Sequence, residues 1–138
     1  MKRKIKFRAW HKEEKILCEV TVLTDKGAFL LGVKSGEDQY FDGGKSVVKA
    51  PDDGRFCDNN EFEVMQYTGL LDNNGVEIYE GDIVSVDNDE NPVITKCIWD
   101  IGQFILEDKS YGEWTRQLYH HPERLLVIGN IYENPELL

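Results

Sequence analysis

Residues 62–86 read FEVMQYTGLLDNNGVEIYEGDIVSV, and this stretch decides the fold class. Its apolar runs are short and are separated by Asn-Gly at 74–75 and by Glu-Gly-Asp at 80–82. Asn-Gly between two apolar runs is a strong signal for a β-hairpin, because both residues tolerate the positive φ angles that tight turns need. The stretch therefore predicts strands at 62–71, 76–79 and 83–86, joined by tight turns.

The alternation of short strands and turns continues in both directions from this stretch. Further strands are expected at residues 4–10, 16–23, 28–33, 93–99, 103–107 and 125–131. Residues 35–60 carry several glycines and few apolar runs, so a long loop is expected there, or an exposed hairpin around 45–49.

Helical structure is expected only as short turns. Residues 111–121 predict a short helix or a turn, which the following proline stops. Near the end of the chain, Asn134-Pro135-Glu136 predicts one helical turn, with asparagine as the N-cap and proline in the first turn.

Many short strands with frequent turns favour a small barrel or sandwich over a sheet with helical crossovers. We predict a mainly β protein with two parts. A small N-terminal β-subdomain spans residues 1–61 and contains the long variable loop at about 35–60. An SH3-like β-barrel spans residues 62–138, whose strand spacing suits five strands.

Charge is distributed unevenly along the 138 residues. Residues 1–65 carry 12 basic and 12 acidic side chains, whereas residues 66–138 carry 4 basic and 14 acidic ones. The second half therefore holds the whole net charge of −10. Such a half repels nucleic acid by its net field. It serves solubility, or it docks a basic partner or imitates DNA.

The cysteines and the hydropathy predict a cytoplasmic protein of the bacterial host. Cys18, Cys57 and Cys97 are widely spaced and form no CxxC pair, so free thiols in a reducing compartment are expected. No signal peptide is recognisable at the start, and no apolar run approaches the roughly 20 residues of a membrane span.

The sequence predicts no catalytic residue, no metal and no cofactor. The histidines form no HExxH or i, i+4 pair, and ordinary surface or partly buried roles are expected for them. Asp87-x-Asp89-x-Asn91 resembles the opening of a calcium loop, but Pro92 stands where that loop needs glycine. No phosphate-binding glycine motif and no GxSxG motif occurs.

One cluster of residues could hold nucleic acid. Lys4, Lys6, Arg8 and Trp10 alternate along the first expected strand and share one face. Basic side chains with an aromatic residue can bind a phosphate backbone and stack a base. The alternatives are a solvated strand face, a sheet edge that lysines guard against strand addition, or a strip that pairs with the acidic half.

Four segments together resemble a known family. They are IKFRAW at residues 5–10, VMQYTGL at 64–70, NGVEIYEGDIV at 74–84 and VIGNIYENPELL at 127–138. The chain resembles the YopX family of small bacteriophage and prophage proteins, from phages of Gram-positive hosts. The resemblance implies a β-rich fold and no assigned activity, so no residue inherits a catalytic role from it.

The leading hypothesis is a non-enzymatic phage or prophage accessory protein that binds an unknown host or phage macromolecule. Nucleic-acid binding through the basic first strand is the second hypothesis, and an uncharacterised enzyme is the third. No membrane partner is expected. A homo-oligomer is a further alternative, because opposed basic and acidic regions can pair between chains.

Overall fold

The computed structural model describes residues 4–32, 54–86, 92–108, 114–117 and 122–138. Within these ranges the chain is mainly β, as expected, and its only helical elements are two short 3-10 turns. In the same ranges no helix has the length and apolar character needed to cross a membrane. The strand expected around 45–49 lies outside the described residues.

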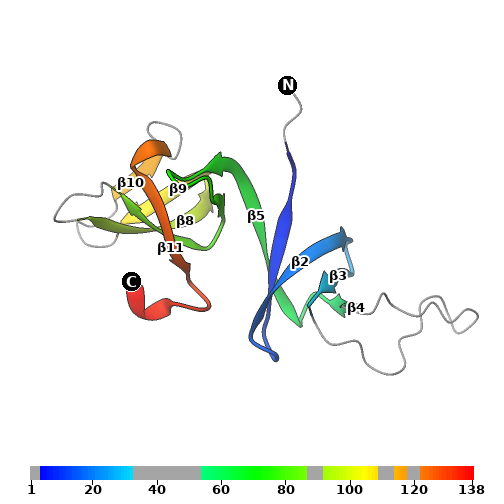
Figure 1. Cartoon of the computed structure of the whole chain (residues 1–138). Helices are drawn as coiled ribbons and strands as arrows, with labels where there is room; N and C mark the ends of the chain where they lie inside the picture. The colour runs from blue at the N-terminus through cyan, green and yellow to red at the C-terminus, as the bar shows by residue number, and fades with distance from the viewer. Residues whose placement is uncertain (1–3, 33–53, 87–91, 109–113, 118–121) are drawn as a thin grey trace, which may run out of the picture. The chain divides into compact units, whose positions relative to one another are not determined.

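The strands follow one another along the chain with short connections (Figure 1). They are β1 (Phe7–His11), β2 (Ile16–Leu23), β3 (Gly27–Leu31), β4 (Gly54–Asp58), β5 (Phe62–Leu71), β6 (Glu77–Tyr79), β7 (Asp82–Val86), β8 (Val93–Asp100), β9 (Gln103–Asp108), β10 (Trp114–Gln117) and β11 (Leu125–Asn130). The 3-10 turns are η1 (Pro122–Arg124) and η2 (Pro135–Leu137).

The chain divides into two compact units. The N-terminal unit comprises Lys6–Met65, and the C-terminal unit comprises Met1–Ile5 together with Gln66–Leu138. The division falls inside β5, so this ten-residue strand contributes to both units.

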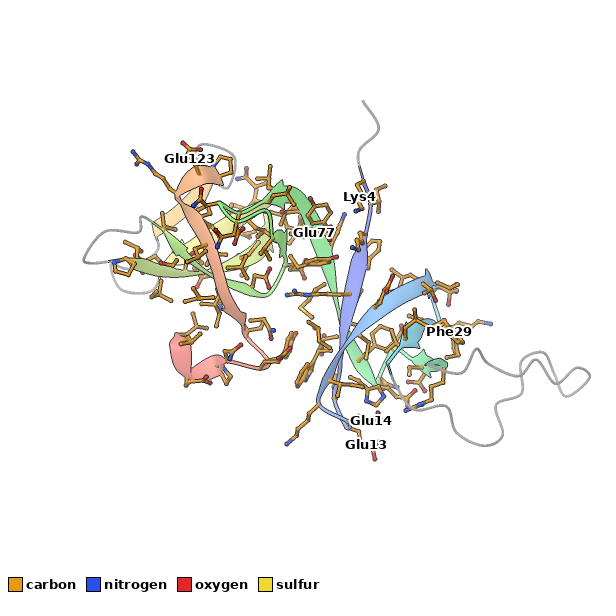
Figure 2. The ribbon with its side chains drawn as sticks, viewed as in Figure 1. Lys4, Glu13, Glu14, Phe29, Glu77 and Glu123 are labelled. Carbon is orange, nitrogen blue, oxygen red and sulfur yellow. The ribbon has the colours of Figure 1, made fainter. Side chains whose placement is uncertain are left out.

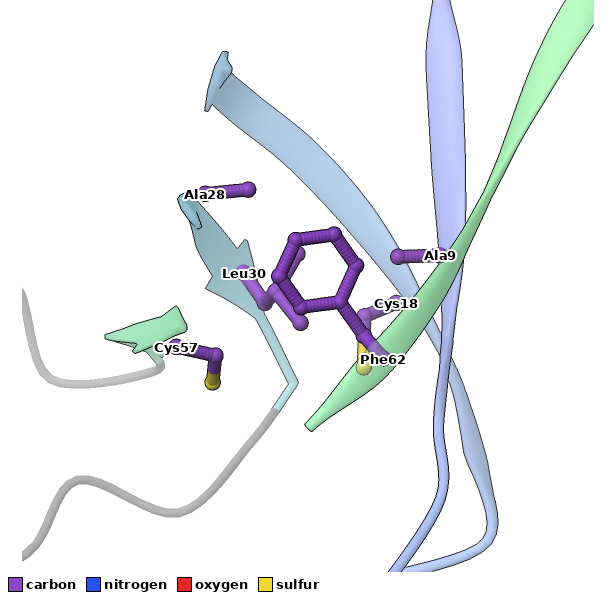
Figure 3. Packing of buried hydrophobic residues seen from close by; sticks show 6 residues of the cluster. All are labelled: Ala9, Cys18, Ala28, Leu30, Cys57 and Phe62. Atoms are coloured by element: carbon purple, nitrogen blue, oxygen red, sulfur yellow. The ribbon is translucent and has the colours of Figure 1, made fainter. Parts of the chain in front are cut away.

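The N-terminal unit is built on antiparallel strands in the hydrogen-bonded order β4-β3-β2-β1-β5. Alternation along the strands turns small and apolar side chains to one face of this sheet. Its core consists of Ala9, Cys18, Ala28, Leu30, Cys57 and Phe62. Figure 3 shows the Phe62 ring in front of Leu30 in this cluster. The register pairs Ala9 with Cys18.

The C-terminal unit contains a five-stranded antiparallel sheet in the order β10-β9-β8-β7-β11, and β6 pairs with the end of β5. Its core consists of Ile78, Val84, Val86, Cys97, Leu106 and Leu125. β7 is buried along its whole length, which fits a strand with neighbours on both sides.

The predicted SH3-like barrel is not confirmed. The order of the five-stranded sheet begins with β10 and ends with β11, and these two strands do not pair, so the sheet stays open. Closing a barrel requires hydrogen bonds between the edge strands. The frequent turns fix the number and length of strands, but they do not fix which edges meet.

Two segments differ from the expected secondary structure. Residues 54–58 fall in the expected loop but form β4, which pairs along its length with β3. Residues 114–117 fall in the expected helix or turn but form β10, which pairs with β9. In both cases the partner strand supplies the ladder hydrogen bonds, and a short segment without clear alternation shows no such partner in its own sequence.

The terminal turn forms with a different cap. η2 begins at Pro135 and Asn134 precedes it, as predicted, but the Asn134 side chain does not cap the turn. Its Oδ1 atom instead accepts a hydrogen bond from the backbone N–H of Asn130, at 3.3 Å.

Candidate functional site

The described part of the N-terminal unit brings together four side chains with acid–base or ligand chemistry. They are His11, Arg55, Cys57 and Glu61. His11 ends β1, Arg55 and Cys57 lie on β4, and Glu61 lies in the turn that leads into β5. This group is called the His11 cluster below.

His11 is buried, contrary to the surface or partly buried role expected from its charged neighbours. It is 0% exposed because Ala9 and His11 alternate with the half-buried Arg8 and Trp10 and so face the same side of the sheet. The backbone N–H of Glu14, at the β1–β2 turn (Figure 2), donates to the His11 Nδ1 atom at 3.1 Å. The same turn is closed by the Lys15 N–H, which donates to the His11 carbonyl.

Arg55 connects His11 to Glu61. The Arg55 Nη1 atom donates to the Glu61 Oε1 atom at 2.9 Å, and Nη2 lies 3.1 Å from the His11 Nε2 atom. The second carboxylate oxygen of Glu61 accepts the backbone N–H of Asp58 at 2.8 Å. The Glu61 carbonyl accepts the N–H of Lys12, so the cluster ties the β4–β5 turn to the residue that follows β1.

The imidazole of His11 cannot satisfy both of its neighbours at once. Each ring nitrogen faces a donor, the Glu14 N–H at Nδ1 and the Arg55 guanidinium at Nε2. A neutral ring accepts through only one nitrogen, and a protonated ring accepts through neither. The hydrogen bond at Nδ1 places the ring proton on Nε2, the atom that a metal would need.

His11, Cys57 and Glu61 were tested as a metal site, because their ligand atoms all lie within 4.8 Å of one another. The arrangement does not fit a metal ion. The Arg55 guanidinium already lies against two of the three ligands. Burial raises the pKa of the Cys57 thiol to about 11, although Arg55 opposes the shift, and only a thiolate is a strong ligand.

The other thiol of this core is also protected. Burial, with a contribution from the charge of Glu14, raises the pKa of Cys18 to about 11. A thiol with such a pKa stays protonated at neutral pH and is a poor nucleophile. All three cysteines are buried and free, in agreement with the expected free thiols.

The His11 cluster predicts a component of acid sensitivity. Burial alone raises the pKa of Glu61, but the hydrogen bonds from Arg55 and from the Asp58 N–H outweigh it, and the net pKa lies below its ordinary value. The folded state therefore holds a proton on Glu61 less tightly than the unfolded state does. This stabilisation is present above the ordinary pKa and is lost as the pH falls through the lowered pKa.

We expect Glu61→Gln to flatten the fall in stability between about pH 7 and about pH 3 by about 1 kcal/mol, after allowance for solvent screening at a side chain that is a third exposed. Urea unfolding curves across this range measure the effect. Glu63→Gln is the matched control, because Glu63 forms an exposed ion pair with Lys12. Equal pH dependence in both variants would show that Glu61 is not specially held.

The residues predicted to bind nucleic acid lie in both units. Lys4 belongs to the C-terminal unit and forms an ion pair with Glu77 at 3.8 Å (Figure 2). Lys6, Arg8 and Trp10 belong to the N-terminal unit and are half-buried. The Arg8 Nη2 atom lies 3.7 Å from the Met65 sulfur as a weak hydrogen-bond donor. The nucleic-acid role of these four residues stays a prediction.

The edge-strand explanation for these lysines is wrong. β1 lies between β2 and β5 in the hydrogen-bonded order, so both of its edges are paired. Lysines that guard an edge belong on a strand with one free side.

Two turns in the C-terminal unit are organised by buried side chains. Asp72 is 6% exposed, and its Oδ1 atom accepts the backbone N–H groups of Asn74 and Val76 at 2.8 and 2.9 Å. Its Oδ2 atom accepts the N–H of Val127 on β11 at 2.9 Å. One carboxylate therefore shapes the β5–β6 turn and fastens it to a strand more than fifty residues away.

The turn after β11 depends on Asn130 and on a glycine before it. The Asn130 Oδ1 atom accepts the N–H groups of Tyr132 and Glu133, at 3.0 and 2.9 Å. A Cβ atom on Gly129 would lie 2.5 Å from the Oδ1 atom of Asn134, so any larger residue at 129 pushes this turn apart. The Ile131 N–H donates to the carbonyl of Gly81, which links this turn to the β6–β7 turn.

A sequence-family model described as YopX protein matches residues 6–138 of the chain. The chain belongs to the YopX family. No curated protein matches it. Among solved structures, protein EF1440 from Enterococcus faecalis is similar, with 30% identity, a TM-score of 0.64 and 99% of each chain covered. Protein YopX from Bacillus subtilis shares the fold, with 18% identity, a TM-score of 0.56, and 96% of this chain and 97% of that chain covered.

The structure explains the two longest segments by which this YopX family member resembles its relatives. Residues 74–84 and 127–138 meet at the paired strands β7 and β11 and at the Ile131–Gly81 hydrogen bond. Their turn residues hold backbone groups, and Ile78 and Val84 fill the core. These segments describe how the C-terminal unit folds, as the sequence reasoning anticipated.

Sequence reasoning missed the His11 cluster. His11 and Arg55 are separated by 44 positions, and Arg55 belongs to the strand that was expected to be a loop. The alternation of Arg55 and Cys57 beside Phe56 was the available signal for a strand, but it is too short to separate from loop composition.

Proposed function

We propose that this protein is an accessory protein encoded by a phage or prophage, that it acts in the cytoplasm of the bacterial host by binding another macromolecule, and that it is not an enzyme. Membership of the YopX family supports the phage origin, since the resemblance is to phage and prophage proteins. The two similar structures come from Enterococcus faecalis and Bacillus subtilis, which agrees with phages of Gram-positive hosts.

The way the buried groups with catalytic chemistry are used carries the proposal. His11 is held by Glu14 and Arg55, Glu61 pairs with Arg55, and Asp72 accepts three backbone N–H groups. Burial keeps the thiols of Cys18 and Cys57 protonated by raising their pKa to about 11. A catalytic acid, base or nucleophile needs a pKa near the working pH and free access to substrate. Each of these groups instead stabilises the fold.

Capture from a bacterial lysate tests the proposal. The tagged full chain is incubated with a lysate of Enterococcus faecalis, with and without nuclease, at low and at moderate salt. We expect one or a few proteins to be retained in every condition. Retention that disappears with nuclease, or that falls steeply with salt, would transfer the function to nucleic-acid binding through Lys4, Lys6, Arg8 and Trp10. Retention of nothing would contradict the proposal.

A further inference from the structure

The tip of the β8–β9 hairpin presents two large apolar side chains to solvent. Trp99 is 53% exposed and Ile101 is 90% exposed. Trp99 meets Phe104 edge to face across the hairpin, with ring centroids 4.8 Å apart. This contact fixes the indole in place and leaves about half of its surface available to a partner.

The backbone at this tip is unfavourable for the residue it carries. Asp100 pairs with Gln103, so Ile101 and Gly102 form a two-residue turn, and both have positive φ angles, 46° and 74°. Asparagine followed by glycine suits such a turn. A β-branched residue in the left-handed region is strained, and this one gains almost nothing from burial. The isoleucine therefore costs stability without contributing to the core.

The charge around the tip indicates the chemistry of a partner. Asp100 is exposed beside Ile101, and the β8–β9 hairpin carries Asp100, Glu107 and Asp108 against one basic residue, Lys96. The half of the chain that contains the hairpin has a net charge of −10. An anionic bilayer would repel this tip, whereas a basic protein surface would attract it.

We propose that the β8–β9 tip is the docking element of the protein, and that it inserts Trp99 and Ile101 into an apolar pocket with a basic rim on a protein partner. This inference rests on the proposed function, which it narrows to a protein partner and one surface. Large anchor side chains at the centre of an interface carry most of the binding energy in many complexes, and charges at the rim steer the encounter.

Two variants test the tip with opposite effects on stability and binding. Ile101→Asn creates the favoured Asn-Gly turn and is expected to raise the thermal midpoint by about 3 °C or more. The same variant is expected to lower capture of the partner at least about tenfold. Asp100→Lys is expected to lower capture and to weaken its dependence on salt.

The readout is a site-specific cross-link from the full chain. A p-benzoylphenylalanine in place of the exposed Gln103 is irradiated in an Enterococcus faecalis lysate, and the adduct is identified by mass spectrometry. Ile5→Asn and Asp25→Lys are matched controls, since Ile5 and Asp25 are exposed elsewhere in the chain. Loss of one protein adduct with both tip variants, and with neither control, supports the proposal.

The other outcomes overturn it. An adduct to a second copy of the chain assigns the tip to self-association, and cosedimentation with phosphatidylglycerol vesicles but not with phosphatidylcholine vesicles assigns it to a membrane. If Ile101→Asn captures the partner as well as the wild type does, the tip is not the docking element, while the proposed function stands. If the wild type captures nothing, both fail together.

Discussion

Replacing Asp72 by alanine is expected to lower the free energy of unfolding by about 3 kcal/mol. The side chain is buried and accepts three backbone N–H groups, from Asn74, Val76 and Val127. Its removal leaves these donors without their partner in a place that water reaches poorly, and each contributes about 1 kcal/mol. Urea unfolding followed by circular dichroism measures the loss.

Asp72→Asn separates the two roles of this carboxylate. An amide keeps one oxygen for Asn74 and Val76 but presents an NH₂ group to the N–H of Val127, so about half of the loss is expected. Asp25→Ala is the control for loss of charge alone, because Asp25 is exposed, and it should change stability by less than about 0.5 kcal/mol. If Asp72→Ala unfolds like this control, the buried carboxylate does not hold the turn.

Leu30→Ala is expected to cost about 3 kcal/mol, because Leu30 is 0% exposed and packs at the centre of the N-terminal core (Figure 3). The loss combines the transfer free energy of the removed carbons with the cavity left among rigid neighbours. Leu17→Ala on β2 is the matched control, since Leu17 is partly exposed, and it should cost less than about 1 kcal/mol.

The rate of thiol alkylation gives a second readout of the same variant. Cys18 and Cys57 belong to the same cluster as Leu30, and burial raises the pKa of both to about 11. A looser core admits water and reagent, so both thiols should react faster with iodoacetamide in Leu30→Ala than in Leu17→Ala. Unchanged stability and unchanged alkylation would mean that this core adapts to the missing side chain.

Secondary structure followed the sequence closely wherever local chemistry is sufficient. The expected strands at 16–23 and 62–71 agree with β2 and β5, and the turn expected around Gly75 forms with a positive φ of 79°. Alternation places side chains on one face of a strand, and glycine or asparagine permits the backbone of a tight turn. Both properties are local, so a single sequence displays them.

By itself, the sequence determined that this protein is mainly β, where most of its turns lie, and that it is related to the YopX family. Only the tertiary structure decided that 54–58 and 114–117 are strands, that the five-stranded sheet stays open, and that His11 is buried against Arg55. These features depend on which distant segments form hydrogen bonds with one another. Pairing between distant strands depends on the packing of the whole chain, which no short segment encodes.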